Sequence, residues 1–257
     1  MSTFRSGSRL RAKRLQRAWF AFADKSAILR KLFLLRKAYL IKHRATHYSQ
    51  WGEDVVLEGF MAKGPPPEQG CYIDVGCFHP KKYSNTYRLY RQGWHGINID
   101  VDPIKRDVFE LARRGDENLC CAVGDAPGRA TLYSFGHYSV LSTLDAATAA
   151  EYMKLGYECS ESQIQVRTLT EIFEASRFRE RRIALLSIDV EGHEEAVLRS
   201  LDFARYRPAL ILVETHAPTL ARMQQEGKYR LLTGELGYEL VNWTGLTAFF
   251  RDAAATP

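Results

Sequence analysis

Apolar and polar positions alternate in blocks along the chain from Tyr48 onward, and these blocks predict strands and helices. Short apolar runs are separated by segments of helix length, such as the stretch 104–114. Buried strands that alternate with helices favour parallel βαβ units in a doubly wound sheet. The predicted strands are residues 71–76, 96–101, 119–123, 163–169, 183–189, 209–214, 238–243 and 246–251.

The last two of these runs differ from the others in their connection. Only Thr244 and Gly245 join them, and so short a link predicts an antiparallel hairpin at the edge of the sheet. The pattern therefore predicts an α/β, Rossmann-like fold whose mostly parallel sheet ends in an antiparallel hairpin.

The first part of the chain has a different composition. Residues 1–44 contain 13 Lys or Arg and one acid, which leaves 23 basic and 29 acidic residues for the remainder. The formal charge of +6 is thus the sum of +12 at the N-terminus and −6 elsewhere. Apolar residues recur between these cations at spacings of three and four, which predicts amphipathic helices. We divide the chain into a basic helical arm, residues 1–47, and a catalytic domain, residues 48–257.

The apolar face of this arm needs a partner, and two alternatives stay open. The arm packs against the domain or a second copy of the chain, giving a homo-oligomer, or it adsorbs to an anionic membrane or a lipid-linked substrate. We expect no nucleic-acid partner, because the domain is net acidic and offers no obvious platform for stacking bases.

The cysteines and the hydropathy indicate the cellular location. The five cysteines include no CxxC pair, which favours a reduced protein with buried thiols. No apolar run approaches the roughly 20 residues that span a bilayer, and no signal-peptide pattern is present. We expect a cytoplasmic protein that its arm can bring to a membrane surface.

Ligands of doubly wound sheets bind at the carboxyl ends of the strands, so the residues there are the candidates for chemistry. After the first strand, Gly76 lets the backbone approach a ligand, and Asp74 either holds the amino acid end of a cofactor or organises the loop. Asp100 ends the second strand and can accept both ribose hydroxyls of a nucleoside cofactor, with Asp102 as its rival or as a helix cap. Asp125 follows the third strand, where it contacts an adenine or only forms a turn.

The ends of two later strands combine acids with histidines. The segment from Asp189 to Glu194 includes Glu191 and His193, and the next strand ends in Glu214 and His216. Burying acids beside an apolar strand is costly unless they meet a ligand, a cation or hydrogen-bond donors. A catalytic site is therefore the more economical explanation.

Several runs together resemble the FkbM family of methyltransferases. They are Tyr48 to Asp54, Tyr72 to Gly76, His79-Pro80, Ser84 to Thr86, Gly93 to Asp100, Ser142 to Leu144, and Ile188 to Glu194. The resemblance extends from about Tyr48 to Arg251, and departs at Cys77, where many members have alanine. It implies a class I methyltransferase fold, S-adenosylmethionine as methyl donor, and usually methylation of a hydroxyl on a sugar, glycoconjugate or secondary metabolite.

From the residues and the resemblance together we predict the site. The predicted cofactor-binding residues are Asp74, Gly76, Cys77, Asn85, Asp100, Asp125 and Asp189, and the predicted catalytic residues are Asp189, Glu191, His193 and His216.

An alcohol needs a base before it attacks a methyl group, and either His193 or His216 can take that role. Alternatively, Asp189 and Glu214 bind Mg²⁺, which lowers the pKa of a bound hydroxyl. Two other classes of protein share this sheet: a nicotinamide-dependent oxidoreductase and a non-catalytic binding module. The missing glycine-rich GxGxxG turn disfavours the first, and the acid and histidine cluster disfavours the second.

Overall fold

The computed structural model describes residues 26–39, 46–62 and 64–254, and the chain divides into two compact units between Thr46 and His47. The first unit contains helix α2, Ala27–Tyr39. One face of this helix presents an apolar stripe of Ile28, Leu32, Leu35 and Tyr39, all exposed, with Lys31 and Arg36 beside it. No helix among the described residues is both long and apolar enough to cross a membrane.

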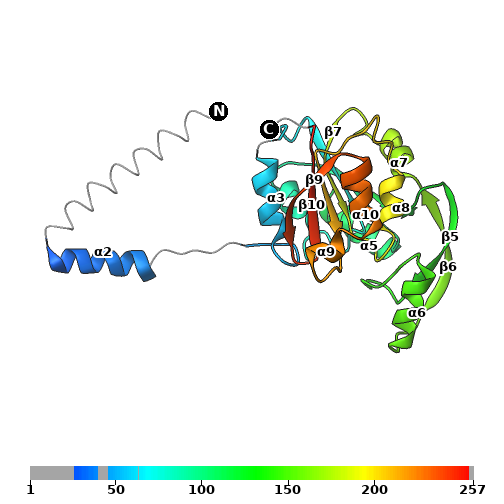
Figure 1. The fold of residues 1–257 in the computed structure, drawn as a ribbon, viewed down its shortest axis with the longest axis horizontal. Helices are drawn as coiled ribbons and strands as arrows, with labels where there is room; N and C mark the ends of the chain where they lie inside the picture. Colours follow the sequence, from blue (N-terminus) through cyan, green and yellow to red (C-terminus); the bar gives the residue numbers. More distant parts are fainter. Residues whose placement is uncertain (1–25, 40–45, 63, 255–257) are drawn as a thin grey trace. The chain divides into compact units, whose positions relative to one another are not determined.

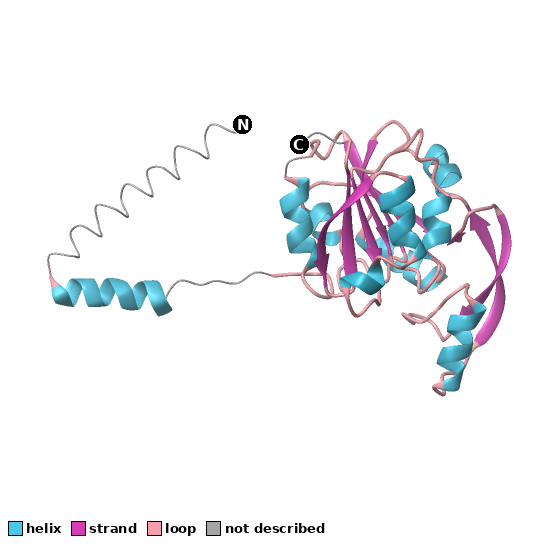
Figure 2. Cartoon of the chain, viewed as in Figure 1, coloured by secondary structure: helices cyan, strands magenta, loops and turns pink. Residues whose placement is uncertain are grey.

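The second unit is built on a seven-stranded sheet in the order β3-β2-β1-β7-β8-β10-β9. Figures 1 and 2 show this sheet with helices packed against it. Its first five members are parallel, and β10 runs antiparallel to both β8 and β9. This confirms the predicted Rossmann-like sheet with an antiparallel end. The strands are β1 Gly70–Val75, β2 Gly96–Asp100, β3 Glu117–Cys120, β7 Arg182–Ile188, β8 Leu210–Glu214, β9 Tyr238–Thr244 and β10 Thr247–Asp252.

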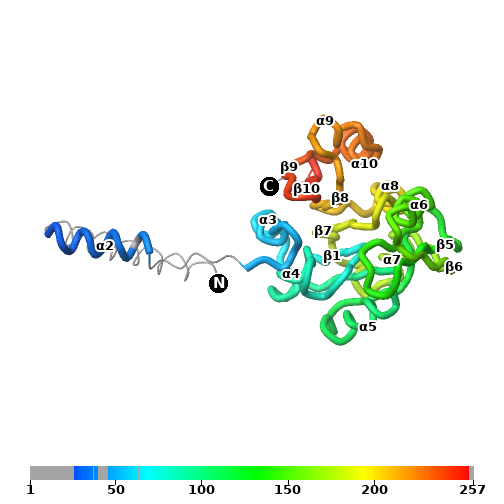
Figure 3. The backbone as a smooth tube through the Cα atoms, turned by 90° about the horizontal axis from the view of Figure 1, so that it is seen from below, coloured from blue at the N-terminus to red at the C-terminus, as the bar shows by residue number. Residues whose placement is uncertain are grey.

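Helices cover both faces of this sheet, because the connections between parallel strands pass over its faces. Successive side chains along each strand therefore enter different cores. Ile73 and Val75 of β1 face a core that includes α7 and α8, whereas Tyr72 faces a second core with α3 and α4. Figure 3 shows β1, β7 and β8 side by side between these layers. The helices are α3 Glu53–Met61, α4 Tyr87–Arg91, α5 Pro103–Ala112, α6 Ala146–Lys154, α7 Leu169–Ala175, α8 Glu194–Arg199, α9 Leu220–Met223, α10 Gly227–Arg230 and the π-helix η1 Leu231–Glu235.

Part of the strand pattern differs from the sequence prediction. The run 163–169 does not join the main sheet: β6, Ser160–Arg167, lies in a three-stranded sheet with β4, Ala122–Val123, and β5, Gly128–Ser134. Strand β5 pairs antiparallel with β6 and is mostly half-buried, with Leu132 its one buried residue, so it lacks the apolar run by which buried strands are found. The predicted strand 119–123 is divided between β3 and β4, and the hairpin turn is Gly245-Leu246, one residue later than expected.

Candidate active site

A cavity of about 310 Å³ opens at the carboxyl ends of the parallel strands, where doubly wound sheets bind their ligands. Its volume falls within the range of small-molecule and cofactor sites. The predicted site residues that line it are Gly76, Asp100, Asp189, Glu191, His193, Glu214 and His216. The other four predicted residues, Asp74, Cys77, Asn85 and Asp125, are not among the lining residues.

Gly76 forms the turn after β1 in close contact with the end of β7. Its φ is +83°, a left-handed conformation that favours glycine, and a Cβ built on it would lie 1.7 Å from the carbonyl oxygen of Asp189. The amide of Gly76 donates to Ile99 of β2, and that of Asp189 donates to Val75. The turn therefore requires glycine, because three strand ends meet there.

Asp74 stabilises the neighbouring loop and lies outside the cavity lining. Its carboxylate accepts a hydrogen bond of 2.7 Å from the hydroxyl of Thr86, whose Oγ1 also accepts from the buried Arg113. Burial raises the pKa of Asp74, and the hydrogen bond from Thr86 opposes this rise. Of the two predicted roles, the observed contacts favour organisation of the loop. Asn85 lies beside it and donates to the hydroxyl of Ser187 in β7.

Cys77 and Asp125 are also absent from the cavity lining. Cys77 is buried, and burial raises the pKa of its thiol well above the usual range. Asp125 is exposed in the turn after β4. The wall of the cavity near this turn is instead apolar, and consists of Ile99, Cys121, Ala122, Val123 and Leu132.

Asp100 reaches the cavity from the end of β2 and is paired with a lysine that the sequence analysis did not single out. Its Oδ2 lies 3.1 Å from Nζ of Lys105, and its Oδ1 accepts from the amide of Asp102. Burial raises the pKa of Asp100, and the ammonium of Lys105 opposes this rise. Asp102 caps helix α5 by accepting from Ile104, which is the structural role weighed for it.

Asp189 and Glu214 meet at the adjacent ends of β7 and β8. The register pairs Ile188 with Val213, so the next residue of each strand lies at the same level. Glu214 is buried, and burial raises its pKa to about 7. Asp189 is exposed at the cavity, yet the protein around its carboxyl group and the charge of Glu214 raise its pKa well above the usual range. Two such close carboxyls favour sharing one proton.

Glu191 is held in an unusual backbone conformation in the loop between β7 and α8. Its φ is +50°, which is rare for a residue with a side chain. The hydroxyl of Tyr152 donates to its carboxylate at 3.0 Å, and Thr143 donates to its carbonyl oxygen at 2.9 Å. Burial raises the pKa of Glu191, and the bond from Tyr152 opposes this rise. Strain of this kind persists where the surroundings fix it, often at functional sites.

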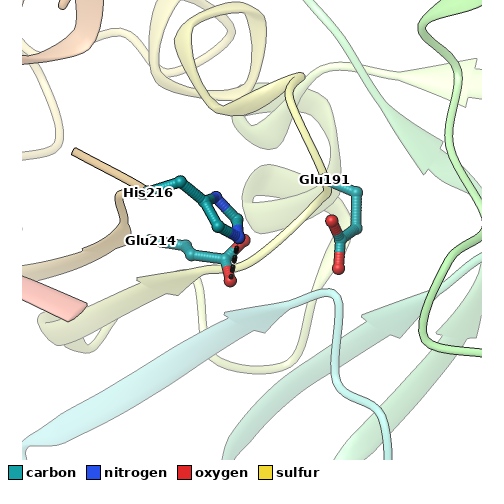
Figure 4. A group of neighbouring side chains, drawn as sticks. All are labelled: Glu191, Glu214 and His216. Carbon is teal, nitrogen blue, oxygen red and sulfur yellow. Dashed lines mark ion pairs between the residues drawn. The ribbon is translucent and has the colours of Figure 1, made fainter. Parts of the chain in front are cut away.

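The two histidines line the cavity from different elements. His193 is half-buried at the start of α8, whereas His216 is exposed, with its Nε2 3.6 Å from Oε1 of Glu214. Figure 4 shows Glu214 and His216 together at the end of β8, facing Glu191 across the cavity. The remaining acid of this segment, Glu194, forms a buried ion pair with Lys228 outside the cavity lining.

Lys105, Tyr152 and Thr143 are the site residues to which the sequence analysis assigned no role. Lys105 follows Asp100 by five residues within an ordinary amphipathic helix, so no local signal marks it. Thr143 lies in one of the runs that resemble the FkbM family, and that run was the available signal. The hydroxyl of Tyr152 reaches Glu191 from α6, a contact that depends on tertiary structure alone.

Comparison with known proteins agrees with this geometry. A family model described as the methyltransferase FkbM domain matches residues 74–240, about two thirds of the chain, including the ends of β1, β2, β7 and β8. No curated protein and no solved structure matches the chain. The family match favours the methyltransferase prediction over the oxidoreductase and the binding module. The chain belongs to the FkbM methyltransferase family.

Proposed function

We propose that this methyltransferase uses S-adenosylmethionine and methylates a hydroxyl oxygen of a sugar, glycoconjugate or secondary metabolite. The observation that supports this most directly is the carboxylate of Asp100, which ends β2 and lines a cavity at the carboxyl end of the sheet. The apolar wall beside it suits a purine ring, and the turn at Gly76 lines the same cavity.

The hydrogen-bonding capacity of Asp100 suits a ribose. Each carboxylate oxygen has two acceptor sites. One site on Oδ1 is used by the amide of Asp102 and one on Oδ2 by Lys105. One site therefore remains on each oxygen, which matches the two hydroxyls of a ribose, and Lys105 keeps the buried carboxylate ionised for this role.

The other end of the cavity supplies groups for the acceptor. When bound, S-adenosylmethionine would provide a methyl carbon whose bond to sulfur breaks as the bond to oxygen forms, with the electron pair left on sulfur. The acceptor loses its hydroxyl proton, which His193 or His216 can take. Glu191, Asp189 and Glu214 line the same end and can orient the other polar groups of the acceptor.

Calorimetric titration of S-adenosylmethionine into the full-length protein tests the cofactor. Asp100→Asn should weaken binding about 10- to 100-fold, because two hydrogen bonds to a charged acceptor are weakened. Asp102→Asn is the matched control: it changes the same residue type outside the cavity lining, and asparagine caps a helix as well as aspartate does. Absence of binding to the folded protein, or equal effects of the two substitutions, would overturn the proposal.

We also propose a cytoplasmic location with contact to an anionic lipid surface through the first unit. All five cysteines are free, as a reducing compartment requires. The exposed stripe Ile28, Leu32, Leu35 and Tyr39 is bordered by cations, in a segment with a net charge of +12. Interfacial helices combine these two features. A second copy of so basic a segment would be repelled, which favours the lipid surface over self-association.

A further inference from the structure

Three side chains at one end of the cavity are arranged as ligands of a cation. One ligand atom each from Glu191, Glu214 and His216 lies within 4.8 Å of the other two, and Figure 4 shows the three facing a shared space. Ligands bound at about 2.0–2.2 Å on opposite sides of a metal ion lie up to roughly 4.4 Å apart. A small side-chain rotation therefore brings all three into coordination range, and the separation of 3.6 Å between Glu214 and His216 already lies within it.

An unsatisfied buried oxygen in this cluster points to a missing ligand. Glu214 is only 9% exposed, and its Oε2 has no hydrogen-bond donor among the described residues. The adjacent Asp189 offers another carboxyl group, which can donate to Glu214 only when the pair holds a shared proton. A buried carboxylate oxygen without a donor costs free energy, and either a proton or a cation removes that cost.

Acidic groups outnumber lysine and arginine at this end of the cavity. Asp189, Glu191 and Glu214 all line this end of the cavity. Among the described lining residues Lys105 is the sole lysine or arginine, and its ammonium is paired with Asp100. Three acids with so little compensation favour the binding of a positive charge between them.

The surroundings of Glu191 resemble the outer shell of a metal site. Ligating carboxylates are usually held by a hydrogen bond from a second residue. Tyr152 donates such a bond to Oε2 of Glu191, while Thr143 fixes the backbone of the same residue. Glu191 keeps its left-handed φ of +50° and lines the cavity. Neither contact is needed for a carboxylate that is merely solvated.

We propose that Glu191, Glu214 and His216 bind one divalent first-row transition metal ion, with Mn²⁺ or Zn²⁺ preferred over Mg²⁺. An imidazole nitrogen beside two carboxylates favours these ions, whereas Mg²⁺ prefers oxygen ligands alone. Three protein ligands leave coordination positions open toward the cavity. The binding site stands on its own geometry. Its placement beside an acceptor hydroxyl rests on the proposed function, and it then leaves His193 as the free histidine for proton removal.

The test is calorimetric titration of Mn²⁺, Zn²⁺ and Mg²⁺ into the full-length protein after chelator treatment, with Mn²⁺ binding also followed by electron paramagnetic resonance. We expect one site, with Mg²⁺ the weakest ligand. Glu191→Gln and His216→Gln should each weaken Mn²⁺ binding at least about tenfold, and Tyr152→Phe about tenfold through loss of the outer hydrogen bond. Asp107→Asn, which changes an exposed acid of α5 outside the cavity lining, should leave binding unchanged.

The outcomes separate the metal site from the cofactor proposal. Metal binding that these substitutions remove, without binding of S-adenosylmethionine, would support the metal site and overturn the cofactor. Binding of S-adenosylmethionine without any metal binding would support the cofactor proposal and overturn the metal site. Equal metal affinity in the wild type, Glu191→Gln and Tyr152→Phe would refute the ligand assignment. Tyr152→Phe removes a single hydroxyl from a half-buried residue, so it gives an answer even where a ligand substitution impairs folding.

Discussion

Replacement of Gly76 by alanine tests the junction of the cofactor turn and the acidic cluster. The new Cβ would lie 1.7 Å from the carbonyl oxygen of Asp189 and 2.7 Å from its carbonyl carbon. Both are backbone atoms at the end of a buried strand, so no flexible side chain can move aside. The turn after β1 and the end of β7 would have to separate by more than an ångström.

The magnitude follows from two contributions. A left-handed backbone costs alanine about 1–2 kcal/mol relative to glycine. The separation also strains the hydrogen bonds from Gly76 to Ile99 and from Asp189 to Val75, each of which contributes about 1 kcal/mol. We therefore expect Gly76→Ala to lower the free energy of unfolding by about 3–4 kcal/mol, within the typical total of 5–15 kcal/mol.

Gly93→Ala is the matched control for this experiment. Gly93 has a φ of +90°, close to that of Gly76, but a Cβ there would meet no atom within 4 Å. It should lose only the conformational contribution of about 1–2 kcal/mol. Urea denaturation followed by circular dichroism gives both values, and calorimetry gives the affinity for S-adenosylmethionine, which only Gly76→Ala should reduce. Equal destabilisation by the two substitutions would refute the close approach of Gly76 to β7.

Three further predictions address other parts of the molecule. Lys105→Met removes the charge that opposes the raised pKa of Asp100, so as pH falls, binding of S-adenosylmethionine should be lost at a higher pH than in the wild type; an unchanged pH profile would contradict this. Hydrogen bonds from Arg207 hold the pKa of Asp252 below its usual range. This pair therefore stabilises the fold fully above a pH of about 4, and the stabilisation is lost as the pH falls through the lowered pKa. Asp252→Asn should lower the stability by about 1 kcal/mol at pH 7, and urea denaturation should show that this difference shrinks in acid. Leu32→Glu in the full chain should reduce sedimentation with anionic vesicles, and equal sedimentation of both proteins would argue against a lipid-binding stripe.

The sequence was sufficient to predict the main sheet, because buried parallel strands are continuous apolar runs that helices separate. It also placed Gly76 and Asp100 at the carboxyl edge of the sheet, where both line the cavity, while their cofactor-binding role stays a prediction. Strand β5 was missed because it is not a continuous apolar run. Only one of its residues is buried, so its existence depends on pairing with β6 and not on an apolar pattern.

The contacts that select among candidate roles were beyond prediction, because they depend on strand order and helix placement. The loop-organising role of Asp74 follows from Thr86, twelve residues away on another element. The pairing of Asp100 with Lys105 follows from the orientation of α5 over the end of β2. A sequence shows which residues end strands, but not which neighbouring groups donate hydrogen bonds to their carboxylates.

The adjacency of β1, β7 and β8 explains why the proposed cofactor and acceptor ends lie close together. The Gly76 turn contacts the carbonyl of Asp189, and the register of β7 with β8 places the acid after each strand at one level. A displacement of the turn would therefore also move Asp189, which is the partner of Glu214. Since both ends depend on one backbone contact, a substitution at Gly76 should weaken cofactor binding and metal binding together, whereas Asp100→Asn should affect the cofactor alone.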